Sequence, residues 1–149
     1  MLFRSVSSKG TLAILTGGGD VPGLNPAIRA ITIRALREGY RVLGIRRGWA
    51  GLVDVVRDAG ADNSANVIPL SFDIVNRAAR SGGTFLHTSR TLPSRLPKSA
   101  VPPHLQDRYA DAVNDITPEI VENLAFLGID VLIPKIGRAS CRERVFRAV

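Results

Sequence analysis

Cysteine is almost absent from this sequence, and long apolar runs are absent altogether. The one cysteine, Cys141, lies near the C-terminus, so the rest of the chain offers neither a disulfide nor a thiolate metal site. No apolar run approaches the roughly 20 residues of a membrane span. Residues 1–9 also lack the continuous apolar stretch of a secretory signal. These absences predict a cytoplasmic protein with no membrane partner.

Most of the chain is only weakly basic, because much of the positive charge lies in the last 15 residues. The net charge is +7, but residues 135–149 hold five of the 20 basic residues and one of the 13 acidic residues. Residues 1–134 keep 15 basic and 12 acidic residues, a net charge of +3, which is typical of a solvated surface. We therefore expect no nucleic-acid partner.

The apolar patterns that are present predict one α/β domain, a Rossmann-like parallel sheet with flanking helices. The 149 residues suffice for one such domain with a core. Buried strands are expected at residues 12–16, 40–45 and 129–133, and a short edge segment at 67–70, whose proline cannot donate to a ladder. Residues 91–103, with four prolines, are expected to form a surface loop.

Three helices are expected from apolar spacing and end signals. The first is capped by Asn25, has Pro26 at its first position and ends at Gly39. Its buried stripe consists of Leu24, Ile28, Ile31 and Ala35. A second helix runs from a Ser71 cap through Ala79, with Phe72, Val75 and Ala79 on its apolar side, and a third opens with Thr117 as its cap.

The most informative stretch is the glycine loop at residues 17–25 (GGGDVPGLN), between the first strand and the first helix. Glycines let the backbone approach a ligand closely, and a helix N-terminus presents N–H groups and a positive dipole end to an anion. The arrangement predicts a phosphorylated ligand. The alternative is a turn that only joins a strand to a helix.

Two common phosphate-binding motifs do not match this loop. A Rossmann G-x-G-x-x-G beginning at Gly17 needs glycine where Pro22 stands, and the second strand ends in Arg46 and Arg47 instead of an acidic residue. A P-loop beginning at Gly18 needs lysine and then Ser or Thr, where the chain has leucine and asparagine.

Three motifs together resemble the phosphofructokinase family. Residues 15–25 (LTGGGDVPGLN) resemble its signature T-S-G-G-D-x-P-G-x-N, with Gly17 in place of the serine. Residues 44–52 (GIRRGWAGL) are similar to its second element, in which an aromatic residue lies between glycines. Residues 81–90 (SGGTFLHTSR) are similar to its loop G-G-T-x-L-x-[ST]-[SA]-R. The resemblance extends over residues 10–134.

The resemblance implies a glycolytic 6-phosphofructokinase, which transfers a phosphoryl group from ATP or pyrophosphate, with Mg²⁺, to the 1-hydroxyl of fructose 6-phosphate. Its partners would be these small molecules and, in the parent enzyme, further copies of itself. The family's catalytic aspartate, magnesium-binding aspartate and sugar-phosphate arginines match positions beyond residue 134. This chain alone is therefore expected to be inactive. A non-catalytic phosphate- or nucleotide-binding half-domain is the alternative.

The resemblance also assigns roles to individual residues. The donor phosphates and nucleotide would contact Gly18, Gly19, Asp20, Trp49, Arg90 and Thr91. The residues that would shape the loops are Gly23, Gly82, Gly83 and Thr84. No metal ligand is assigned in this chain. For Trp49, packing in the core is an equal alternative.

Two further positions differ from the family. Arg29 matches one arginine of the bacterial effector site, but the partner four residues on is Ile33, which argues against effector control. His87 stands where many members carry glycine, and it receives no role.

Residues 135–149 depart from the family completely. They resemble the translated read-through of a sequencing-library adapter, so we expect a non-native tail that packs without relation to a sheet cut short at residue 134. The domain is accordingly bounded at residues 1–134, the amino-terminal part of the family's large donor-binding domain. A genuine basic arm, which would make the protein an anion-binding module, is the alternative.

Overall fold

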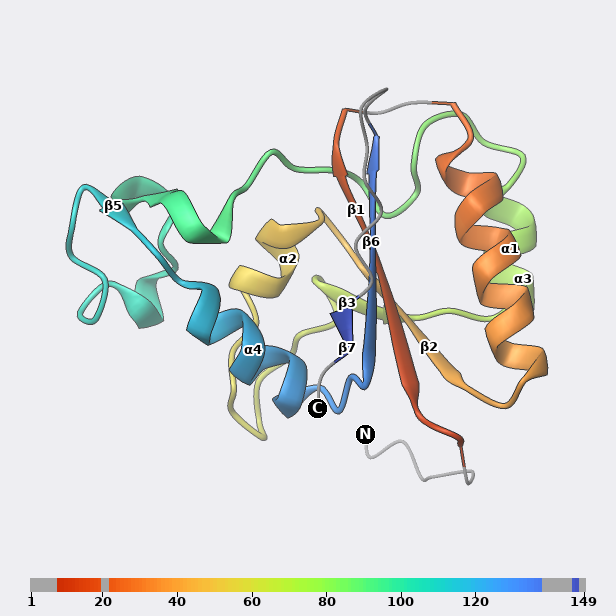
Figure 1. Ribbon diagram of the computed structural model, residues 1–149, viewed down its shortest axis with the longest axis horizontal. Coiled ribbons are helices and arrows are strands. Elements are labelled where there is room, and N and C mark those ends of the chain that lie inside the picture. The colour runs from red at the N-terminus through yellow and green to blue at the C-terminus, as the bar shows by residue number, and fades with distance from the viewer. Residues whose placement is uncertain (1–7, 20–21, 138–145, 148–149) are drawn as a thin grey trace.

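One central strand organises the computed structural model, which describes residues 8–19, 22–137 and 146–147. Strand β1 (Thr11–Gly18) lies between β2 (Arg41–Ile45) and β6 (Val131–Gly137), and it pairs with both in parallel. Helices cover both faces of the sheet (Figure 1). The expected α/β architecture with a parallel sheet and flanking helices is confirmed.

The alternating side chains of β1 supply two separate cores. Ala13 and Leu15 belong to a cluster that contains residues of α2 (Trp49–Val53) and α4 (Thr117–Phe126). Ile14 belongs to the other cluster, beneath α1 (Leu24–Arg37) and α3 (Phe72–Ala78). All three strand residues are fully buried, as expected for a central parallel strand.

The edges of the sheet are antiparallel. At one edge, β3 (Val67–Pro69) pairs with β2, which confirms the expected edge segment. At the other edge, β7 (Phe146–Arg147) pairs with β6. Strand β6 itself continues to Gly137, three residues past the boundary expected at residue 134, so the beginning and a later part of the expected tail pair with the sheet. The remainder of that segment, 138–145 and 148–149, lies outside the described residues.

Helix α1 buries Leu24, Ile28 and Ala35, as its spacing predicts. The expected cap is wrong: Gly23, with φ 97°, is the N-cap, and it makes no side-chain capping bond. Asn25 lies inside the first turn, fully buried. Its Nδ2 donates to the carbonyl oxygens of Ala78 and Ser81, each at 3.1 Å, and its Oδ1 accepts from the Phe85 N–H at 2.9 Å. Asn25 therefore joins α1 to the third motif.

The two other expected helices are present, with changes at their ends. Ser71 caps α3 by accepting from the Ile74 N–H, as expected. Thr117 is not a cap: α4 has Ile116 at its N-cap, and the Asp115 carboxylate accepts from the Thr117 N–H at 2.9 Å. The expected apolar side of α3 is wrong in one place, because Phe72 is 43% exposed.

The proline-rich segment 91–103 is more structured than a surface loop. It forms 3₁₀ turns at Pro93–Arg95 and Lys98–Ala100, and β4 (Leu96–Pro97), which pairs with β5 (Val113–Asn114). Another 3₁₀ turn follows at Pro103–Leu105. The prolines alternate with apolar side chains that enter the core, namely Leu96, Val101 and Leu105.

An ionic network around the buried Glu119 holds residues 108–109 and α2 against α4. The buried Glu119 carboxylate accepts from Arg57 at 2.7 Å, from Arg108 at 2.8 Å and from the Tyr109 hydroxyl at 3.0 Å. One turn further on, Asn123 accepts from Arg57 at 2.7 Å and donates to the carbonyl of Leu52 in α2 at 2.7 Å.

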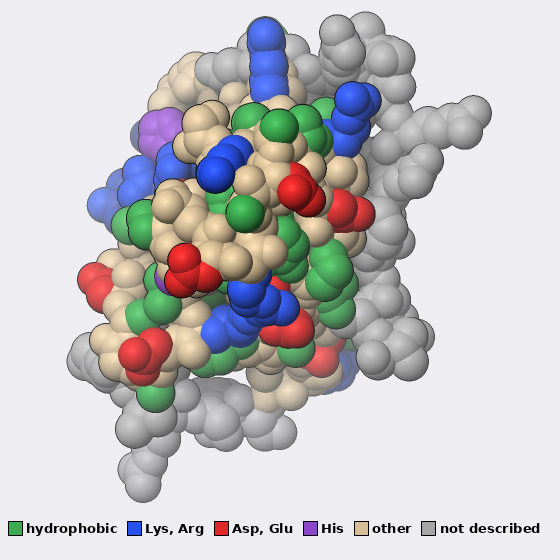
Figure 2. Space-filling model, turned by 90° about the vertical axis from the view of Figure 1, so that its left-hand side faces the viewer, with side chains coloured by type: hydrophobic (Ala, Val, Ile, Leu, Met, Phe, Trp, Pro, Cys, Tyr) green, Lys and Arg blue, Asp and Glu red, His purple; other side chains and the backbone are tan. Residues whose placement is uncertain are grey.

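Burial opposes the ionisation of Glu119, but the hydrogen bonds from Arg57 and Tyr109 and the charges of Arg57 and Arg108 outweigh it. The pKa of Glu119 is therefore lower than its ordinary value of 4.5. For Tyr109, burial and the neighbouring Glu119 raise the pKa of the phenol. On the face that carries α4, acidic and basic side chains are interspersed (Figure 2).

The substitution Glu119→Gln should destabilise the fold in a pH-dependent way. At pH 7 we expect the free energy of unfolding to fall by about 2 kcal/mol, because the neutral amide no longer forms ion pairs with the two guanidinium groups. Since the folded-state pKa is lowered, the stabilisation is present above pH 4.5 and is lost as the pH falls through the folded value. Urea unfolding from pH 7 down to pH 3 should show the two proteins converging.

The matched control is Glu122→Gln. Glu122 also pairs with Arg57, at 2.8 Å, but its side chain is 57% exposed, so the loss should stay below about 1 kcal/mol. A Glu119→Gln difference that is equally large at both ends of the pH range would contradict the electrostatic explanation.

Candidate functional site

The three sequence motifs meet at the carboxyl ends of β1 and β2. The Gly18 N–H, at the end of β1, donates to the carbonyl oxygen of Ser89 at 3.0 Å. The Thr16 hydroxyl donates to the carbonyl oxygen of His87 at 2.7 Å. The third motif is thus fastened to the first at two points. In open parallel sheets, ligands bind outside the carboxyl ends of the strands.

The second motif joins the same edge. The Arg47 N–H donates to the carbonyl oxygen of Leu86 at 2.7 Å, and the Ala50 N–H donates to the Ser89 hydroxyl at 3.4 Å. The turn at residues 46–48 leads directly into α2, which the sequence pattern did not predict because five residues show too little periodicity.

Two glycines of the second motif leave no room for a side chain. A Cβ at Gly48 would overlap the carbonyl oxygen of Thr16, and Gly48 also has φ +57°. A Cβ at Gly51 would overlap the carbonyl oxygen of Arg46. The backbones of β1 and the second motif can therefore lie in direct contact only with glycine at position 48, and the second motif can turn back on its own backbone only with glycine at position 51.

The residues expected to shape the loops are arranged in different ways. Gly23 and Gly83 have positive φ, 97° and 73°, and the buried Thr84 hydroxyl lies 3.4 Å from that of Thr16. Gly82 has open space around its Cβ position, so the expected shaping role has no steric basis there.

Comparison with known proteins identifies the arrangement. A family model described as Phosphofructokinase matches residues 11–143. The chain belongs to the phosphofructokinase family.

Two curated relatives share just under half of the aligned positions with this chain. The chain is 48% identical over 86 residues to the pyrophosphate–fructose 6-phosphate 1-phosphotransferase of Dictyoglomus thermophilum, which covers 58% of this chain and 22% of the relative. It is 43% identical over 79 residues to an ATP-dependent 6-phosphofructokinase of Streptococcus pyogenes, and this alignment covers 53% of this chain and 20% of the relative. The chain thus spans about a fifth of the length of the curated relatives it matches.

Solved phosphofructokinases have the same fold. The T-state enzyme of Pichia pastoris aligns with a TM-score of 0.62 at 24% identity and covers 87% of this chain and 12% of its own. The Saccharomyces cerevisiae enzyme aligns with a TM-score of 0.59 at 25% identity, and the alignment covers 85% of this chain and 14% of the enzyme's chain.

The donor residues that the family resemblance assigns lie around this edge, with one outside the described residues. Gly18 (φ 82°) and Gly19 end β1 and begin the loop, whereas Asp20 is not among the described residues. Arg90 is exposed directly after Ser89, and Thr91 follows it, half-buried. These assignments remain predictions for a phosphofructokinase site.

Trp49 begins α2 and packs, half-buried, against the core cluster on that face of the sheet. Part of the Trp49 side chain therefore packs in the core, as the alternative interpretation expects. Its position in the second motif also places it beside the candidate site. Asn123 fixes the same helix through the carbonyl of Leu52.

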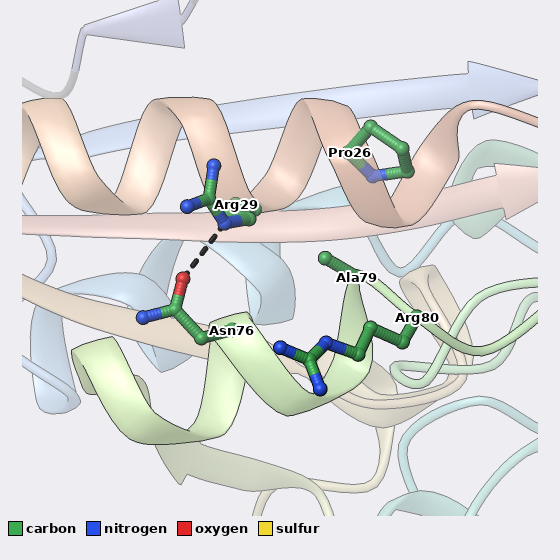
Figure 3. A pocket seen from close by; sticks show the side chains of 5 residues that line it. All are labelled: Pro26, Arg29, Asn76, Ala79 and Arg80. Carbon is green, nitrogen blue, oxygen red and sulfur yellow. Dashed lines mark hydrogen bonds between the residues drawn. The ribbon is translucent and has the colours of Figure 1, made fainter.

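Arg29 faces a hollow between α1 and α3 rather than the glycine loop. The hollow has a volume of about 580 Å³, and beside it the Arg29 Nε donates to the Asn76 Oδ1 at 2.7 Å, which links α1 to α3 (Figure 3). Arg80 lines the same hollow, a residue that the sequence analysis missed because 51 positions separate it from Arg29. The other lining residues are Pro26 and Ala79.

The described residues lack two features. No helix among them is long and apolar enough to cross a membrane. No group of three or more His, Cys, Asp or Glu side chains among them is placed to hold a metal ion.

The substitution Gly48→Ala should disrupt the site by separating β1 from the second motif. We expect a loss of about 3 kcal/mol, because the new Cβ meets a backbone oxygen and the residue keeps a left-handed φ. Thermal unfolding measures the loss. The matched control is Gly60→Ala, where the nearest atom lies 3.8 Å from the new Cβ, and its stability should change by less than about 0.5 kcal/mol. Equal melting temperatures for the two variants would refute the close contact.

Proposed function

We propose that this chain is the donor-binding part of a 6-phosphofructokinase, an enzyme that transfers a phosphoryl group from ATP or pyrophosphate to the 1-hydroxyl of fructose 6-phosphate. The observation that carries the proposal is the convergence of the three motifs at one edge of the sheet, fastened by the Gly18–Ser89 and Thr16–His87 hydrogen bonds. The names of the curated relatives support the reaction.

The proposed donor site uses backbone amides and the start of α1. Gly18 and Gly19 let the loop approach phosphate oxygens without interference from a Cβ. Helix α1 is 14 residues long, has no side-chain cap and carries no acidic residue in its first turn, so the positive end of its dipole is not neutralised there. Arg90 would add a guanidinium fork, which suits a phosphate group.

Both donors remain candidates because relatives of both kinds match the chain. The pyrophosphate-dependent relative is 48% identical and the ATP-dependent one is 43% identical, over similar lengths. The shared chemistry is a diphosphate group, and this is what the glycine loop would bind.

Magnesium would enter with the donor, because phosphoryl transfer neutralises the developing charge with a metal ion. The described residues form no cluster of carboxylates that fits such an ion. The family's magnesium-binding aspartate matches a position beyond residue 134, so the contribution proposed for the described residues is to hold and orient the phosphates.

The acceptor and the base that activates its hydroxyl belong to the proposal for the whole enzyme, of which this chain spans about a fifth. Among the described residues, the groups proposed to contact the donor are the Gly18 and Gly19 amides and the Arg90 guanidinium, and none of them can act as the base for the acceptor hydroxyl. We therefore expect the 149-residue chain to bind a donor and not to turn it over.

Binding of a donor should depend on the glycine loop. Isothermal titration with pyrophosphate and with ATP should detect weak binding to the 149-residue chain and no binding to Gly19→Val, because a branched side chain would keep phosphate away from the amides. Gly60→Val is the control, since Gly60 lies in an exposed turn away from the motifs. Equal affinity in Gly19→Val would remove the loop from the donor site.

Activity should appear when the missing parts are supplied. Residues 1–134 joined to the carboxyl-terminal remainder of the Dictyoglomus thermophilum relative should phosphorylate fructose 6-phosphate with pyrophosphate or ATP in a coupled assay. The 149-residue chain alone should show no turnover above background. A folded chimera that is inactive with both donors would contradict the proposed reaction, and turnover by the chain alone would contradict the proposed division of roles.

A further inference from the structure

The side chains of Arg46 and His87 meet at the same edge of the sheet, and neither received a role above. One guanidinium nitrogen of Arg46 (NH2) lies 3.3 Å from the His87 Nε2. A guanidinium can only donate, so Nε2 accepts and the ring proton lies on Nδ1. Both backbones are fixed: the Arg46 N–H donates to the Asn66 carbonyl at 2.8 Å, and the His87 carbonyl accepts from Thr16.

The backbone around this pair is held in an unfavourable conformation. Among the described residues, only Arg47 (φ 58°) and His87 (φ 59°) are non-glycine residues with positive φ. Glycine would adopt these angles without cost, whereas a residue with a Cβ does so at a penalty. Strained residues of this kind concentrate at functional sites. Arg47 follows Arg46 in the sequence, and His87 lies beside Arg46 in space. The backbone hydrogen bond from the Arg47 N–H to the Leu86 carbonyl joins the two strained segments.

The two neighbouring arginines differ in their partners. Arg47 is neutralised: it forms an ion pair with Asp54 at 2.8 Å and also donates to Asn66. Arg46 points to a histidine instead of a carboxylate. Within the part of the chain that the structure describes, no carboxylate lies in ion-pair distance of Arg46 or of Arg90. Positive charge therefore remains available on both sides of the His87 loop.

We propose that Arg46 and His87 form a second phosphate-contacting pair of the donor site, which binds the part of a polyphosphate chain on the β2 side of the glycine loop. The proposal rests on the proposed function. Strand β2 adjoins β1 in parallel register, with Ile45 beside Leu15, so Arg46 follows β2 just as the glycine loop follows β1. The Thr16–His87 hydrogen bond places the third motif between them.

The pair suits a phosphate oxygen chemically. Arg46 supplies guanidinium N–H donors, and charge-assisted bonds of this type are the strong ones. The His87 ring, which Arg46 orients through Nε2, presents its Nδ1–H as a further donor. A polyphosphate would thus meet backbone amides at Gly18 and Gly19 and side-chain donors at Arg46, His87 and Arg90.

The test is titration of the 149-residue chain with pyrophosphate, inorganic tripolyphosphate and ATP. Arg46→Gln should weaken binding of at least one of these anions about tenfold, the usual effect of one charge-assisted hydrogen bond. His87→Gly should weaken it about threefold while raising the melting temperature, because glycine relieves the strain at φ 59° and keeps the carbonyl that accepts from Thr16. Arg37→Gln is the control, since it removes the same charge from the exposed last turn of α1.

The outcomes separate this inference from the proposed function. Binding that is lost in Gly19→Val but unchanged in both Arg46→Gln and His87→Gly would overturn the inference and leave the glycine-loop site standing. Equal weakening of binding in Arg46→Gln and Arg37→Gln would show that only the net charge of the protein matters, and it would also overturn the inference. Absence of binding by the unaltered chain would overturn both.

Discussion

Burial of β1 on both faces is the constraint on which the rest of the molecule depends. Its central side chains, those of Ala13, Ile14 and Leu15, enter two cores, and the buried backbone groups beside them need hydrogen-bond partners on the neighbouring strands. Parallel partners on both sides satisfy these demands and bring the carboxyl ends of β1, β2 and β6 to one edge. The glycine loop leaves the sheet at that edge, so its position follows from the packing of the strand before it.

Close backbone contact then brings the other motifs to the loop. Thr16 contacts the second motif through the carbonyl that faces Gly48 and the third through its hydroxyl. Asn25 fastens the third motif to the start of α1. The motifs are separated by some 20 to 60 positions in the sequence, yet backbone contacts and the side chains of Thr16 and Asn25 hold them together. Close backbone contacts leave little room for side chains, and nearly half of the residues in the three motifs are glycine, serine or threonine.

The sequence predicted the elements whose signals are local. The strands β1, β2 and β6, the stripe of α1 and the Ser71 cap all follow from periodicity or capping chemistry within a few residues. The role of Asn25 could not be predicted, because its partners lie more than 50 positions away and the residue has ordinary capping chemistry. The segment 91–103 was misjudged for a similar reason, since its prolines are local signals whereas burial of Leu96 depends on distant residues. At the candidate site, the family motifs singled out the glycine loop, while the orientation of Arg46 toward His87 required coordinates.

The short strand β3 has a consequence for the behaviour of the protein in solution. An exposed sheet edge is a template on which another chain can add a strand and begin to aggregate. Here that edge is only three residues long, runs antiparallel to its neighbour and ends in Pro69, which has no N–H to offer. A second molecule would find almost no ladder to extend along β3, so this edge of the sheet resists intermolecular strand pairing.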